Sequence, residues 1–188
     1  MIRTATQKDL DSVLDIERLS FGIPWSLNSF RKAFQEIFLV EDNVAGYLIA
    51  ECRQRNCYMA TIKRLAVHPE QRGSGIGREL LDTGLAILMD RKIELVMLNV
   101  ETSREAAVGL YTKFGFRVTC SSFRHASIAF AMDSKASIFY TMELQMNQKN
   151  TFSPHLSLND NLKHQVNAIL PPFVIEGQDG VTWDEMLW

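Results

Sequence analysis

The chain has 188 residues, 46% of them hydrophobic, and a formal net charge of −2, which is enough material for one domain with a sizeable core. Acids and bases are interspersed, and this balance argues against nucleic acid or an anionic membrane as the main partner. No run approaches the roughly 18 apolar residues of a membrane span, and the N-terminus lacks the apolar core of a secretion signal, so we expect a cytoplasmic protein.

Hydrophobic spacing and turn signals predict the element order β-α-α-β-β-β-α-β-α-β-β. Thr6 and Asp9 form a capping-box pattern before the first helix, and Ser26 can cap the second. The later strands are expected at Phe38–Val40, Val44–Cys52, Tyr58–Val67, Leu95–Val100, Phe116–Phe123 and Ser137–Leu144, and the later helices from about Gly75 to Arg91 and from about Thr102 to Phe114.

Three strands in succession, followed by a β-α-β unit, predict an α/β (α+β) fold with a mixed, mostly antiparallel central sheet and helices on both faces. Residues 1–145 carry this pattern and are expected to form one domain. Residues 146–188 hold three of the five prolines and show no periodicity. We expect them to form a partly ordered C-terminal extension, to which the sequence assigns no role.

The cysteines and histidines do not form a metal-binding pattern. Cys52, Cys57 and Cys120 are an odd number with no C-x-x-C spacing, and the histidines are scattered. Reduced thiols and no metal are therefore expected.

The stretch HPEQRGSGIGRELL places three glycines immediately before a predicted helix. It is not a nucleotide P-loop, because Gly77 is followed by Arg78 rather than Lys-Ser/Thr, and the glycine register does not fit a dinucleotide fingerprint. The first turn of a helix has unpaired N–H groups and a partial positive charge, so glycines there let a phosphate or diphosphate approach the backbone. Arg72 and Arg78 flank the loop and can add charge-assisted bonds. A plain tight turn is the alternative.

Two segments, in order, resemble the GCN5-related N-acetyltransferases (GNAT). Arg72–Gly77 fits the Q/R-x-x-G-x-G/A motif of that superfamily, and Ala106–Phe116 is similar to its A-A-x-x-L-Y-x-x-x-G-F segment. The resemblance covers about residues 1–145. Within the superfamily, Glu17–Ser26 is similar to the E-x-x-x-F-x-x-P-W-S segment of the ribosomal-protein-alanine acetyltransferases, which modify the N-terminal amino group of a protein.

The resemblance implies direct transfer of acetyl from acetyl-coenzyme A to an amine, without a metal. It implies that backbone amides of the loop hold the cofactor's diphosphate and that the strand before the loop pairs with its pantetheine arm. The implied cofactor-binding residues are Leu65, Ala66, Val67, Arg72, Gly73, Ser74, Gly75, Ile76, Gly77 and Arg78.

Tyr111 matches the family's general acid, which protonates the departing thiolate; a buried aromatic on an amphipathic helix is the alternative. At the position of the base the sequence departs from the subfamily, whose L-E-V-R, with the glutamate as base, reads Leu98-Asn99-Val100-Glu101 here. Asn99 can position a water but cannot accept a proton near neutral pH. Glu101 shares its strand face and is a candidate base, or a solvated carboxylate. Arg104 replaces an asparagine that lies near the cofactor in the subfamily.

The effect of Asn99 depends on the acceptor, because an α-amino group tolerates a poor base better than a lysine does. An α-amino group with a pKa near 8 is roughly a tenth neutral at pH 7, whereas a lysine is less than about 0.1% neutral. The resemblance to the ribosomal-protein-alanine acetyltransferases implies a protein N-terminus as the acceptor, and Trp25 is expected either to line the acceptor cleft or to pack in the core. A small amine, such as a polyamine, amino acid or antibiotic, is the alternative substrate, and a non-catalytic acetyl-coenzyme A-binding module is the alternative class. The sequence is compatible with a monomer or a dimer.

Overall fold

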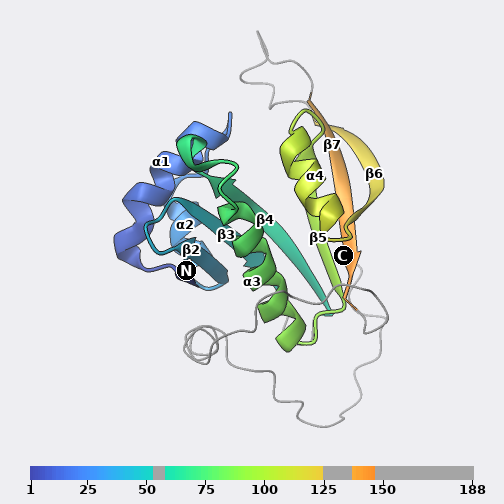
Figure 1. Cartoon of the computed structure of the whole chain (residues 1–188), viewed down its shortest axis with the longest axis horizontal. Helices are drawn as coiled ribbons and strands as arrows, with labels where there is room; N and C mark the ends of the chain where they lie inside the picture. Colours follow the sequence, from blue (N-terminus) through green and yellow to red (C-terminus); the bar gives the residue numbers. More distant parts are fainter. Residues whose placement is uncertain (53–57, 125–136, 147–188) are drawn as a thin grey trace.

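A mixed sheet in the order β1-β2-β3-β4-β5-β7-β6 is the framework of the protein (Figure 1). The computed structural model describes residues 1–52, 58–124 and 137–146, so the C-terminal extension, apart from Met146, lies outside the described residues. The strands are β1 (Ile2–Thr4), β2 (Ile37–Glu41), β3 (Gly46–Glu51), β4 (Met59–Val67), β5 (Leu95–Glu101), β6 (Arg117–Arg124) and β7 (Ser137–Gln145). The helices are α1 (Leu10–Ser20), α2 (Leu27–Ala33), α3 (Ile76–Asp90) and α4 (Glu105–Lys113), with 3-10 turns at Gln7–Asp9 and Pro69–Gln71.

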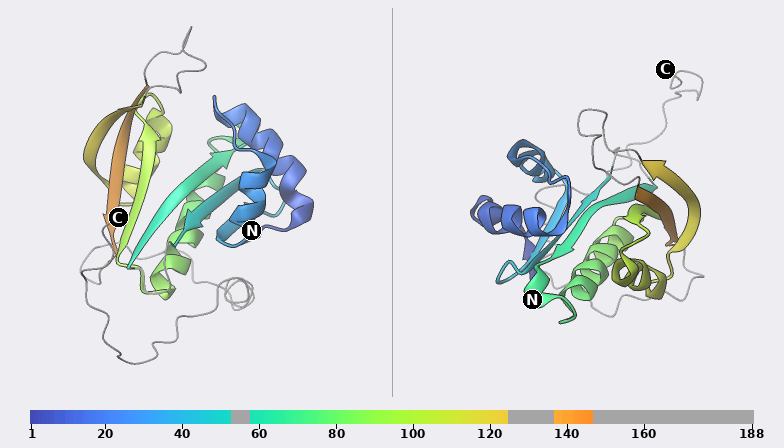
Figure 2. Two further views of the ribbon diagram at one scale, coloured as in Figure 1. Left: turned by 180° about the vertical axis from the view of Figure 1, so that it is seen from behind. Right: turned by 90° about the horizontal axis from the view of Figure 1, so that it is seen from above.

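The two faces of the sheet are covered by different helices (Figure 2). On one face, Leu39 and Leu48 pack in a cluster with Leu81 of α3 and with residues of α4. On the other face, Phe38 belongs to a second cluster with Phe30 of α2 and with residues of α1. Successive strand residues enter different clusters because side chains alternate across a strand. Every neighbouring strand pair is antiparallel except β4 and β5, so the predicted fold class and element order are confirmed.

Local differences from the prediction have local causes. The strand expected from Val44 begins at Gly46, because Val44 has a φ of 53° and extends the preceding turn. Ser26 caps α2 as predicted, accepting a hydrogen bond from the Ser29 N–H at 3.2 Å. No helix within the described ranges combines the length and the apolarity needed to cross a bilayer.

The capping box at Thr6 is reinforced by an ion pair. The Asp9 carboxylate accepts from the Thr6 N–H at 2.7 Å and receives two hydrogen bonds of 2.8 Å from the Arg3 guanidinium. The bonds from Arg3 are the main cause that lowers the pKa of Asp9 from 3.8 to about 2. The N-terminal strand is thus tied to the start of the first helical segment through one buried carboxylate.

Asp9→Asn should therefore destabilise the protein by about 1–2 kcal/mol at pH 7, because the amide keeps the cap but loses the ion pair. Since the folded pKa lies below the unfolded one, the contribution is present above about pH 4 and is lost as the pH falls towards 2. Urea unfolding of both proteins at pH 7 and pH 2.5 checks this. A stability difference that does not shrink at pH 2.5 would contradict the ion-pair explanation.

Candidate active site

The two central strands separate half-way along their length. β4 and β5 are paired in parallel only from Met59↔Leu95 to Ile62↔Leu98. Beyond that point β4 stays with β3 and β5 stays with β7, so the strands diverge (Figure 1). Because β3 is the only described strand that pairs with residues 64–67, their other backbone edge is open to a ligand as far as the described residues show.

An irregularity in β4 marks the point of divergence. Ile62 pairs with Ala50 and Arg64 pairs with Ile49, so Lys63 is an extra residue opposite the partner strand. An extra residue bends a strand and reverses which face the following side chains occupy. Consequently Leu65 packs on the α3 side of the sheet, whereas Ala66 joins the α1 side.

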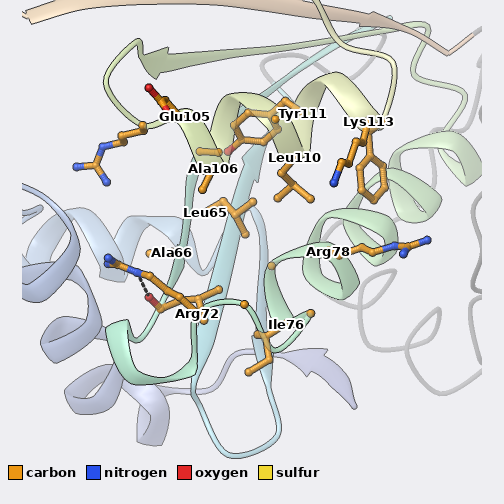
Figure 3. A pocket seen from close by; sticks show the side chains of 18 of the residues that line it. Leu65, Ala66, Arg72, Ile76, Arg78, Glu105, Ala106, Leu110, Tyr111 and Lys113 are labelled. Atoms are coloured by element: carbon orange, nitrogen blue, oxygen red, sulfur yellow. Dashed lines mark hydrogen bonds between the residues drawn. The ribbon is translucent and has the colours of Figure 1, made fainter.

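A cavity of about 1370 Å³ lies where the strands diverge. It is bounded by the end of β4, the loop and first turn of α3, and helix α4, whose side chains face β4 across the opening (Figure 3). All the predicted cofactor-binding residues line it except Ser74, whose hydroxyl donates to the Gln71 carbonyl at 2.6 Å. The structure thus brings together two segments, residues 65–67 and 72–78, that the sequence linked only by resemblance.

The loop before α3 has the backbone that an anion site requires. Gly73 and Gly75 have φ values of 82° and 95°, which L side chains rarely adopt, and a Cβ added at either would meet nothing within 4 Å. The space beside them is therefore open. Since α3 begins at Ile76, the first N–H groups of the helix have no intrahelical acceptor. A Cβ on Gly77 would lie 3.5 Å from Val67 and 3.8 Å from Leu110, so this glycine keeps the passage between β4 and α4 wide.

Charge in the cavity suits a polyanion. Arg72, Arg78, Arg104, Lys113 and Arg117 are among its lining residues, and Glu105 is the single acidic residue among the described ones. The Arg72 guanidinium donates to the Val67 carbonyl at 3.2 Å and to the Ser20 hydroxyl at 3.3 Å, so it also braces the loop. Open backbone amides and surplus cations fit the diphosphate of a coenzyme A.

Tyr111 lies on α4 with its ring packed edge-on against Phe116 at 5.7 Å. It lines the cavity beside Ala106 and Leu110 and opposite Leu65 (Figure 3). Burial raises the pKa of its hydroxyl above the ordinary 10, an effect that the charge of Arg104 partly offsets. The phenol is thus held in its neutral form, as a proton donor must be.

Asn99 and Glu101 lie on the opposite face of β5 from the buried Val96, Leu98 and Val100. Neither is among the residues that line the cavity. Asn99 accepts a hydrogen bond from the Thr141 hydroxyl at 2.9 Å, and the Glu101 carboxylate lies 3.4 Å from Arg104 Nε. A role for either as base or water-positioning group remains a prediction.

Glu17, which the sequence identified only as the first residue of a motif and not as a site residue, is a buried carboxylate in contact with Trp25. Glu17 is 0% exposed, accepts from the Trp25 N–H at 2.8 Å and from the Tyr47 hydroxyl, and lies 3.3 Å from Arg64 Nε. Burial is the main cause that raises the pKa of Tyr47, and the hydrogen bond that Tyr47 donates to Glu17 raises it further. Trp25 is half-buried and packs edge-on against Phe30, with the ring centroids 5.7 Å apart, as expected for a residue at the edge of the core. A role for Trp25 in binding the acceptor remains a prediction.

The sequence did carry a signal for this carboxylate. The buried stripe of α1 contains Leu10, Val13 and Ile16 and then two polar residues, Glu17 and Ser20. A charged residue at a core-facing position of an amphipathic helix needs a buried partner.

Comparison with known proteins agrees with this geometry. Residues 10–116 match the model of the acetyltransferase (GNAT) family. The chain is 30% identical over 113 residues to the [ribosomal protein bS18]-alanine N-acetyltransferase of Salmonella typhimurium, covering 57% of this chain and 74% of that enzyme. It is 48% identical over 107 residues to a mycothiol acetyltransferase of Thermobispora bispora, covering 49% of this chain but only 36% of that protein.

A solved structure shares the fold. The ribosomal-protein-S18-alanine N-acetyltransferase of Escherichia coli superposes with a TM-score of 0.66 at 22% identity, covering 84% of this chain and 99% of that one. The family match spans more than half of the residues, and it includes both the diverging strands β4 and β5 and the glycine loop before α3. The chain belongs to the GNAT family of N-acetyltransferases, which take their acetyl group from acetyl-coenzyme A.

Proposed function

We propose that the protein acetylates the α-amino group of a protein N-terminus, as a ribosomal-protein-alanine type enzyme, in the cytoplasm. The observation that carries this proposal is the chemistry at the position of the subfamily's base: Asn99 stands in place of the glutamate and accepts from Thr141, and Glu101 is paired with Arg104. An amide at that position favours an amine that is already partly neutral, and at pH 7 the neutral fraction of an α-amine is more than about 100-fold larger than that of a lysine. The similarity to the Salmonella enzyme supports the same acceptor.

Acetyl-coenzyme A supplies an activated acetyl thioester, and the chain positions it. In this proposal the N–H groups of residues 73–78 hold the diphosphate, and the open edge of Leu65–Val67 pairs with the pantetheine arm. Tyr111 donates its proton to the departing thiolate, whose thiol has a pKa of about 8.5. The structure supports this with a neutral, cavity-lining phenol.

A small-molecule amine is the second candidate acceptor. The 48% identity to a mycothiol acetyltransferase over about half of this chain favours it. The cofactor half of the site is common to both candidates, so they differ only in what approaches the thioester.

A panel of acceptors separates the candidates. Wild-type protein and acetyl-coenzyme A are incubated with peptides that have a free N-terminus and no lysine, with N-terminally blocked peptides containing one lysine, and with polyamines, amino acids and aminoglycosides. Mass spectrometry should show acetylation of the free N-termini. Modification of lysines or small amines alone would overturn the proposed acceptor, whereas coenzyme A binding without any product would indicate a non-catalytic module.

Asn99→Glu tests the argument about the base. The new carboxylate should raise kcat/KM for a peptide N-terminus about 3- to 10-fold at pH 6.5, where the amine is mostly protonated, and change it little at pH 9. Asn99→Gln, which keeps an amide, should show no such pH-dependent gain. A pH–rate profile that is unchanged in the Glu variant would place the acceptor amine away from this position.

A further inference from the structure

The open ends of β4 and β5 share no register pairs beyond Ile62↔Leu98. Backbone pairing therefore does not fix the distance between the strands beyond this point, and side-chain contacts can set it at the end where, in the proposed function, the acyl group and the amine meet. Two arginines approach this gap from its two sides: Arg64 lies on β4, and Arg104 immediately precedes α4 after β5.

Arg104 is held at the gap by three kinds of contact. Its Nη2 donates to the carbonyl of Ser20 at 2.7 Å, its Nε lies 3.4 Å from the Glu101 carboxylate, and its guanidinium carbon lies over the Phe21 ring, 5.1 Å from the centroid. Ser20 is the last residue of α1, where unpaired carbonyls and the helix dipole favour a cation. The arginine thus joins the β5 side of the cavity to the end of α1.

Arg64 approaches the same ring from the other strand. Its guanidinium carbon is 4.4 Å from the Phe21 centroid and 4.8 Å from the Trp25 centroid. The fully buried carboxylate of Glu17, 3.3 Å from Arg64 Nε, fixes its orientation. Each guanidinium has its own carboxylate, so the pair can share one ring without an uncompensated positive charge.

We propose that Phe21 is a positioning residue for acetyl transfer: its ring joins Arg64 to Arg104 across the mouth of the cleft and so sets the spacing between the strand that holds the acetyl donor and the helix that carries Tyr111. Cations stack favourably on aromatic faces, and a leucine of similar bulk offers no such face. The inference rests on the family's reaction and on the proposed role of Tyr111, and it concerns geometry rather than contact with the reacting atoms. A displacement of about 1 Å in such a site can cost about 100-fold in rate.

The test uses Phe21→Leu, Arg104→Gln and the double variant in the full-length chain. Each single variant should lower kcat about 10- to 100-fold. For Phe21→Leu, the dissociation constant for acetyl-coenzyme A, titrated without acceptor, should stay within about threefold. Because both act through one bridge, the double variant should be no slower than the slower single variant. Phe21→Tyr, which keeps the ring, should retain most of the activity.

Matched controls separate positioning from general stability. Phe34→Leu removes a ring that packs on Phe38 at 5.2 Å on the same face of the sheet, and Arg18→Gln breaks an exposed ion pair with Asp15. Both variants should leave kcat unchanged, even where they lower the free energy of unfolding measured in urea. Multiplicative effects in the double variant, or an equal fall in kcat for Phe34→Leu, would overturn the proposal.

An additional measurement does not depend on the acceptor. Phe21→Leu should accelerate amide hydrogen exchange in residues 64–67 and 101–106 of the free protein, whereas Phe34→Leu should not. Unchanged exchange in residues 101–106 would show that Arg104 is not held through the ring. If wild-type protein acetylates no N-terminus, the proposed acceptor fails, but the exchange result still decides the bridge.

Discussion

Tyr111→Phe should lower kcat about 100- to 10,000-fold while leaving the affinity for acetyl-coenzyme A within about threefold. The substitution removes one oxygen from a ring whose packing against Phe116 is otherwise kept. Since burial raises the pKa of Tyr111 above 10, the phenol stays protonated as the pH rises to that value, and the wild-type kcat should show no fall between pH 7 and pH 10 that is due to this group. Fixed-time assays of coenzyme A release between pH 7 and pH 10 measure both the loss of kcat in the variant and the pH dependence of the wild-type kcat.

Tyr58→Phe is the matched control, because Tyr58 is exposed and does not line the cavity. It should have wild-type kinetics. If Tyr111→Phe loses cofactor binding together with rate, the hydroxyl holds the donor rather than protonating the thiolate. If it loses neither, Tyr111 is simply a core aromatic.

Gly75→Ala should weaken acetyl-coenzyme A binding about 30- to 100-fold. At a φ of 95° an alanine is strained by about 1–2 kcal/mol, and its Cβ would project into the open space beside the first turn of α3. Relief of the strain would turn the helix-start amides away from the ligand, and the methyl group itself would occupy the ligand's place. Calorimetric titration with coenzyme A, together with urea unfolding, measures the two consequences separately.

Gly22→Ala serves as the comparison, since Gly22 also has no atom within 4 Å of an added Cβ but has no positive φ and lies outside the cavity. It should bind coenzyme A normally. A Gly75→Ala protein that loses stability but keeps its affinity would mean that this loop is a tight turn and not a diphosphate site.

The parts of the fold that depend on local pattern could be predicted from the sequence. Strand alternation and helix periodicity gave the element order, and the glycine stretch before α3 indicated an open helix start that the structure places against the cavity. Ser26 as a cap and Asp9 in a capping box are equally local. These features depend on residues within a few positions of each other.

The contacts across the cleft could not be predicted, because they join residues far apart in the chain. The contacts of Phe21 with Arg64 and Arg104 depend on the extra residue in β4 and on the divergence of β4 from β5. Nothing in the alternating pattern fixes where two strands stop pairing. The buried position of Glu17 on α1 could have indicated a partner, but not which of the many arginines it would be.

The short parallel seam between β4 and β5 also has a mechanical meaning. The antiparallel ladders on either side of it, β3–β4 and β5–β7, have six and seven register pairs, while four register pairs join β4 to β5. Tension applied between β3 and β7 should therefore separate the molecule first along this seam. The acetyl donor would then be released before either half unravels, so single-molecule pulling should reveal an early, ligand-sensitive rupture.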